Sequence, residues 1–159
     1  MPHFDSILLT GASSGIGRAL AEACAAPGVT LHLSGRNPAR LAAAAAACRA
    51  RGATVRTQVV DVRDAAAMAR WIIGSGRLDL VVANAGIAPG KGETEPETRA
   101  VFATNLDGVL NTVLPAIEKL AAQPRAPGGL RRPYCGHRLD RRVRPLASQP
   151  GLWCVEGGG

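Results

Sequence analysis

Residues 10–17 read Thr10-Gly11-Ala12-Ser13-Ser14-Gly15-Ile16-Gly17, and this stretch decides the fold of the 159-residue chain. It follows the apolar run 6–9 and precedes a segment, 18–26, with helical character that stops at Pro27-Gly28. A strand, a turn of small residues and a helix in this order let the backbone approach a pyrophosphate at the helix N-terminus. The stretch therefore predicts a dinucleotide-binding turn, with a tight turn that binds nothing as the alternative.

The alternation of strand and helix continues along the first 123 residues. Further strands are predicted at 30–34, 54–60 and 78–83, and further helices at 38–51, 64–73 and 95–120. Within the last helix, Pro115 is a candidate kink. The pattern predicts an α/β fold of Rossmann type, a doubly wound parallel sheet with helices on both faces, of which residues 1–123 supply the N-terminal half.

Three more motifs follow at the places where such a sheet would bind its ligand. Asp61-Val62 follows the third strand, Asn84-Ala85-Gly86 ends the fourth, and Thr104-Asn105-Leu106 with Gly108 lies on the last helix. Together with the glycine spacing G-x-x-x-G-x-G, they resemble the short-chain dehydrogenase/reductase family over residues 6–114. The resemblance implies that the cofactor is bound by Gly11, Ser13, Ser14, Gly15, Ile16, Gly17, Arg36, Asp61, Val62, Asn84, Ala85 and Gly86.

The same resemblance implies an NAD(P)-dependent oxidoreductase that transfers a hydride to or from a carbonyl or alcohol substrate. It implies that Asp61 accepts from the adenine amino group and that Asn105 belongs to the proton relay. Two alternatives remain open. Asp61 is also a favourable carboxylate near a helix N-terminus, and Asn105 is also consistent with a structural amide whose hydrogen bonds are satisfied.

The residues Ser34-Gly35-Arg36 bear on the choice between NADP and NAD. In a dinucleotide fold the residue about 20 positions past the glycines reads the ribose 2′ position. No acidic side chain for the 2′-hydroxyl of NAD occurs there, whereas the Arg36 guanidinium suits a 2′-phosphate. The sequence favours NADP with NAD as the alternative, and Arg36 is otherwise interpreted as a solvated arginine.

The catalytic Tyr-x-x-x-Lys of the resembled family does not occur in the sequence. The single tyrosine is Tyr134, its fourth neighbour is Arg138, and no lysine follows Lys119. An arginine stays protonated and has a different geometry, so we do not transfer the catalytic role to Tyr134. Residues 124–159 also lack strand or helix periodicity and are predicted to form an irregular basic tail.

A change of reading frame between residues 120 and 131 would account for this tail. Read one base later, the codons of residues 152–159 accommodate Tyr-Gly-Ala-Ser-Lys-Ala-Ala, which restores the family's Tyr and Lys. The codons of residues 134–141 accommodate an apolar strand ending in a serine, thirteen positions before that tyrosine. We therefore expect 124–159 to be an out-of-frame translation, with a non-catalytic dinucleotide-binding fragment as the alternative function.

The distribution of charged residues and cysteines limits which partners are expected. Residues 1–123 hold 12 basic and 10 acidic side chains, whereas 124–159 hold 7 and 2. Because the excess charge lies in the tail, nucleic acid is not the expected partner, and a basic nucleic-acid binder is the third function considered. The four cysteines lack paired spacing, so we expect neither a metal site nor a disulfide. We expect no membrane segment and a cytoplasmic location, and the resemblance implies that full-length members form homo-oligomers.

Overall fold

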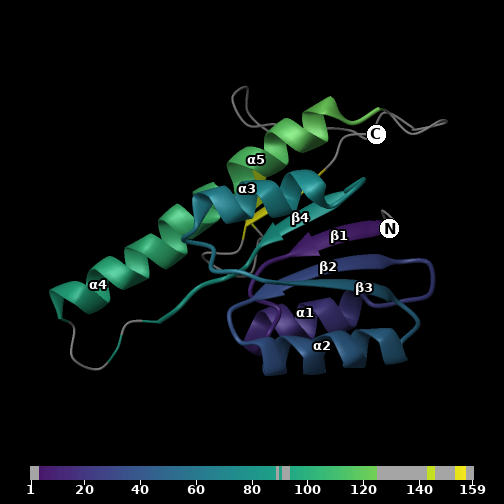
Figure 1. Ribbon diagram of the computed structural model, residues 1–159, viewed down its shortest axis with the longest axis horizontal. Helices are drawn as coiled ribbons and strands as arrows, with labels where there is room; N and C mark the ends of the chain where they lie inside the picture. The colour runs from purple at the N-terminus through teal and green to yellow at the C-terminus, as the bar shows by residue number, and fades with distance from the viewer. Residues whose placement is uncertain (1–3, 89, 91–93, 125–142, 146–152, 157–159) are drawn as a thin grey trace.

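The computed structural model describes residues 4–88, 90, 94–124, 143–145 and 153–156 (Figure 1). Strands and helices alternate along the chain as the sequence predicts. Their bounds are β1 (Ser6–Leu9), α1 (Gly15–Cys24), β2 (Thr30–Gly35), α2 (Pro38–Ala50), β3 (Thr54–Val59), α3 (Ala65–Gly74), β4 (Leu80–Ala83), α4 (Glu95–Phe102), the π-helical turn η1 (Ala103–Asp107), α5 (Gly108–Ala122), β5 (Val143–Pro145) and β6 (Trp153–Glu156).

The sheet has the strand order β3-β2-β1-β4-β6-β5, and its first four strands in this order are parallel. The α/β prediction is thereby confirmed. Helices α1 and α2 lie on one face of the sheet and α3 and α5 on the other, as Figure 1 shows. Since parallel strands end at the same edge, the turn after β1 and the segments after β2, β3 and β4 meet there.

Alternation along β1 divides the core between the two faces. Ile7 and Leu9 belong to the cluster formed with α1 and α2, whereas Leu8 belongs to the cluster formed with α3 and α5. Successive side chains of a strand point to opposite faces, so a central strand must be apolar on both. All three residues are at most 4% exposed, as a strand covered by helices on both sides requires.

The helical stretch 95–122 contains an irregularity at η1 rather than at Pro115, which lies inside α5. By length and composition alone this 28-residue stretch could cross a membrane. In the structure one side of α5 joins the core, because Val113, Ala116 and Leu120 are buried in the cluster with α3. The stretch is therefore also explained as an amphipathic helix that covers the sheet.

Two short segments of the predicted irregular tail are strands in the structure. Strand β6 pairs antiparallel with β4, and β5 pairs antiparallel with β6. The outer edge of β4 presents backbone N–H and C=O groups that any extended segment can pair with, and Trp153 and Val155 are residue types that favour strands. Apart from Pro124, the remaining tail residues, among them Tyr134, lie outside the described residues.

His32 provides a test of the buried face of β2. It is 3% exposed, and burial, with smaller contributions from the charges of Arg56 and Lys119, lowers its pKa from 6.5 to about 4. Between these values the unfolded chain binds a proton at His32 and the folded chain does not. The contribution is therefore fully present above pH 6.5 and is lost as the pH falls toward 4.

We expect the free energy of unfolding to fall by about 1.4 kcal/mol per pH unit across this window on account of His32. Urea denaturation at pH 7.5, 5.5 and 4.5 measures the slope. A His32→Gln variant removes the titrating group and should show a correspondingly smaller slope. The same slope in both proteins would contradict the assignment to His32.

Candidate functional site

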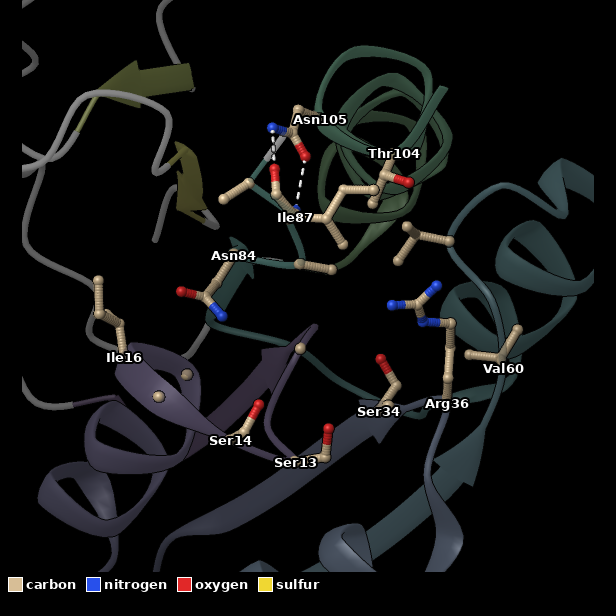
Figure 2. Close-up of a pocket in the computed structure, with 18 residues that line it drawn as sticks. Ser13, Ser14, Ile16, Ser34, Arg36, Val60, Asn84, Ile87, Thr104 and Asn105 are labelled. Atoms are coloured by element: carbon tan, nitrogen blue, oxygen red, sulfur yellow. Dashed lines mark hydrogen bonds between the residues drawn. The ribbon is translucent and has the colours of Figure 1, made fainter. Parts of the chain in front are cut away.

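A cavity of about 620 Å³ opens where β1, β2 and β4 end (Figure 2). Of the residues that sequence reasoning placed at the cofactor or in the relay, all except Asp61 line it. Those that line it are Gly11, Ser13, Ser14, Gly15, Ile16, Gly17, Arg36, Val62, Asn84, Ala85, Gly86 and Asn105. Residues not predicted as contacts also line it, namely Ser34, Gly35, Val60, Ile87, Ala88 and Thr104.

The glycine turn has the backbone conformation that its sequence indicates. Gly11 and Gly15 have φ angles of 72° and 56°, values that residues with a side chain rarely adopt. Ser14 precedes α1 in extended conformation without a capping side-chain hydrogen bond, and the first turn of α1 carries no acidic residue. The first N–H groups of α1 thus lack a side-chain acceptor at the cavity, and a helix N-terminus of this kind favours an anion.

The Thr10 hydroxyl connects the glycine turn to the end of β4. Its oxygen accepts from the backbone N–H groups of Asn84 at 3.0 Å and Ala85 at 3.1 Å, and it donates to the Val82 carbonyl at 3.4 Å. The Asn84 side chain donates in turn to the Thr10 carbonyl at 3.0 Å. Thr10 is 1% exposed and is the first residue of the glycine motif 10–17, but it was not predicted as a site residue. Its position at the start of this motif is the feature of the sequence that could have identified it.

Asn105 fixes the segment that follows β4. Its Oδ1 accepts from the Ile87 N–H at 2.8 Å, and its Nδ2 donates to the Ile87 carbonyl at 2.9 Å. The oxygen and the nitrogen of the amide therefore both bind one residue of the cavity wall. This is consistent with the alternative that Asn105 is a structural amide whose hydrogen bonds are satisfied. Asn105 lies in η1, and π-helical turns occur frequently at functional sites. Its place in a proton relay stays a prediction.

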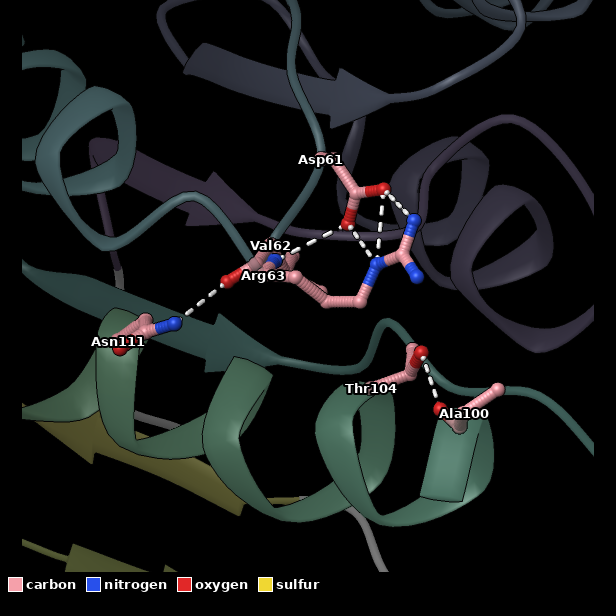
Figure 3. Close-up of polar contacts among 6 residues, drawn as sticks. All are labelled: Asp61, Val62, Arg63, Ala100, Thr104 and Asn111. Carbon is pink, nitrogen blue, oxygen red and sulfur yellow. Dashed lines mark hydrogen bonds and ion pairs between the residues drawn. The ribbon is translucent and has the colours of Figure 1, made fainter. Parts of the chain in front are cut away.

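Asp61 is paired with Arg63 rather than exposed to the cavity (Figure 3). The Arg63 side chain donates to both carboxylate oxygens, with the shortest distance 2.6 Å, and the Arg63 N–H donates at 3.0 Å. The side-chain hydrogen bonds from Arg63 hold the pKa of Asp61 below its usual value. The adjacent Val62 does line the cavity, and its carbonyl accepts from Asn111 at 2.9 Å. Sequence spacing did not indicate the pairing of Asp61 with Arg63.

Arg36 projects into the cavity from the end of β2, as Figure 2 shows. Within the described part of the chain, the structure records no hydrogen bond or ion pair for its guanidinium. An exposed cation near an uncapped helix N-terminus makes this end of the cavity favourable for anions. Across the same described ranges, no group of three or more His, Cys, Asp or Glu side chains could hold a metal ion.

Comparison with known proteins places these features in a family. A family model described as short chain dehydrogenase matches residues 5–128. The chain is 32% identical over 124 residues to 3-dehydrosphinganine reductase TSC10B of Arabidopsis thaliana, covering 76% of this chain and 38% of the relative. It is 34% identical over 128 residues to a monensin polyketide synthase putative ketoacyl reductase of Streptomyces virginiae, covering 78% and 47%.

Solved structures agree with this comparison. A short-chain dehydrogenase from Sphingobium yanoikuyae in complex with NADPH has 30% identity and a TM-score of 0.66, over 72% of this chain and 48% of that one. A short chain dehydrogenase from Mycobacterium paratuberculosis bound to NAD has 28% identity and a TM-score of 0.65, over 73% and 51%. The chain thus spans about half the length, or less, of these relatives.

A substitution at Gly17 tests how tightly the site is packed. A Cβ atom there would overlap the Gly11 carbonyl oxygen and the Asn84 side-chain nitrogen, whereas a Cβ at Gly74 would meet nothing within 4 Å. Gly17→Ala should lower the free energy of unfolding by about 1–3 kcal/mol, because backbone must move. Gly74→Ala, the matched control, should be neutral or stabilising by up to about 1 kcal/mol. Urea denaturation measures both, and equal losses would contradict the packing argument.

Proposed function

The chain belongs to the short-chain dehydrogenase family, and from this premise we propose that residues 1–123 bind NADP, in preference to NAD, for hydride transfer to or from a carbonyl or alcohol compound. Members of this family are oxidoreductases, and the solved relatives named above hold NAD or NADPH. A nicotinamide dinucleotide is therefore the supported class of cofactor. NADP, the substrate class and activity belong to the proposal.

The observation that carries the proposal is the joint placement of two anion-binding features in one cavity. The uncapped N-terminus of α1 would receive the pyrophosphate, and Arg36 would receive the 2′-phosphate. Asn84 and Ala85, held by Thr10, would form the wall against the ribose that follows. When bound, the cofactor supplies or accepts the hydride, and the protein positions it.

Arg36 is the residue on which the preference for NADP depends. Arg36→Gln should weaken NADPH binding by about tenfold or more and leave NADH binding nearly unchanged, because a charge-assisted hydrogen bond to phosphate is lost. Arg70→Gln removes an equal charge from α3 outside the cavity and is the matched control. Fluorescence titration with both cofactors measures the effect. A variant at Arg36 that loses affinity for both cofactors equally would contradict the 2′-phosphate assignment.

We further propose that residues 124–159 are an out-of-frame translation of the segment that carries the catalytic Ser, Tyr and Lys. The codon analysis carries this proposal, and the family match that ends at residue 128 supports it. The chain as written is then expected to bind NADPH without turnover, as the non-catalytic alternative also requires.

Sequencing the DNA across codons 120–131 distinguishes an out-of-frame tail from a genuine non-catalytic dinucleotide-binding protein. A missing or extra base there, with turnover restored in the corrected protein, is the expected result. Dehydrogenase turnover by the chain as written would contradict the proposal for the tail.

We also propose an oligomeric state and a cellular location for the protein. Phe102, Leu106, Leu110 and Leu114 recur every four residues along the 95–122 stretch and are 44–60% exposed. This apolar stripe supports association with a further copy of the protein, which sedimentation velocity would measure. We propose that the protein is cytoplasmic and that neither nucleic acid nor a membrane is its partner. Salt-dependent retention on DNA or co-sedimentation with lipid vesicles would overturn those exclusions.

A further inference from the structure

The Ser34 hydroxyl is a buried polar group that has no partner in the protein. Ser34 is 1% exposed, and within the described ranges its Oγ is the buried side-chain atom recorded without a hydrogen bond. Buried polar groups in native proteins are almost always paired, because an unpaired one loses its hydrogen bond to water without gaining another. The exception calls for a ligand that supplies the missing partner.

The position of Ser34 indicates which ligand this is. It lies near the end of β2 and lines the same cavity as the glycine turn. Arg36, which follows directly after β2, also lines this cavity. Figure 2 shows both projecting into the cavity, with Ser13 and Ser14 at its floor.

Among the described residues that line the cavity, none forms a hydrogen bond with the Ser34 hydroxyl. The lining side chains of Val60 and Val62 are apolar, and the Val62 carbonyl is already bound by Asn111. The Ser34 backbone is also engaged, because its carbonyl accepts from the Ala12 N–H at 2.9 Å. The hydroxyl alone is left without a partner at the wall of the cavity.

We propose that Ser34 is a specificity-determining residue whose hydroxyl forms a hydrogen bond with the adenosine half of the dinucleotide, beside the 2′ group that Arg36 binds. This inference rests on the proposed cofactor function. A site built to hydrogen-bond a ligand leaves its own polar group unpaired when that ligand is absent, so the hydroxyl stabilises only the complex.

The test compares Ser34→Ala with Ser75→Ala, which removes a buried hydroxyl that does have a partner. Ser75 is 6% exposed, and its Oγ donates to the Ile72 carbonyl at 2.6 Å outside the cavity. Without cofactor, Ser34→Ala should keep or raise the urea midpoint of unfolding, whereas Ser75→Ala should lower it. With cofactor, Ser34→Ala should weaken NADPH binding about five- to tenfold and Ser75→Ala should not.

ADP-ribose, which is the dinucleotide without its nicotinamide ring and without a 2′-phosphate, shows whether the contacted atoms lie outside these two groups. The Ser34→Ala loss should appear with ADP-ribose as with NADPH. Three results would overturn the inference while leaving the proposed function intact: unchanged NADPH affinity in Ser34→Ala, a loss absent with ADP-ribose, or a lowered urea midpoint like that of Ser75→Ala. A wild-type protein that binds neither NADPH nor NADH would overturn the proposed function and this inference together.

Discussion

The hydrogen bonds between Thr10 and the end of β4 are the constraint on which the cavity depends. Through them, the turn after β1 and the segment Asn84–Ala85 form one wall, although they are more than 70 residues apart in the sequence. The Asn84 side chain then fills the space in which a Cβ of Gly17 would lie. The glycine and the asparagine therefore require each other: the close approach of α1 to β4 needs both the missing side chain and the amide that bridges to Thr10.

The sequence could predict the architecture and most of the lining because both depend on periodicity and on strand ends. Apolar runs of the right length identified the four parallel strands, and parallel strands bring their carboxyl ends together whatever the side chains are. The pairing of Asp61 with Arg63 could not be predicted in this way, since both are polar residues in a loop and only their conformation decides the contact. The same applies to η1 at Asn105, where the helical pattern continues although the hydrogen bonding changes.

Electrostatic balance explains why the pairing of Asp61 matters to the cavity. Arg36 and Asp61 follow neighbouring strands, and the Val60 N–H donates to the Gly35 carbonyl at 3.3 Å between them. An unpaired carboxylate so close to Arg36 would offset its charge and repel a phosphate. The Arg63 fork neutralises that carboxylate, so the guanidinium of Arg36 and the N-terminus of α1 determine the sign of the local potential.

The antiparallel strand β6 shows that backbone pairing at a sheet edge does not by itself select one neighbour for β4. Backbone N–H and C=O groups are the same in every residue, so the free edge of β4 accepts an extended segment in either direction. Selection comes from side chains that fill both faces, as Ile7 and Leu9 on one face and Leu8 on the other do in β1. A doubly wound sheet obtains its next parallel strand through a helical crossover, and the stretch 95–122 is the crossover helix that lies over β4 in this chain. The strand that this crossover favours beside β4 is parallel and apolar on both faces, which is the type that the codons of residues 134–141 accommodate in the shifted frame.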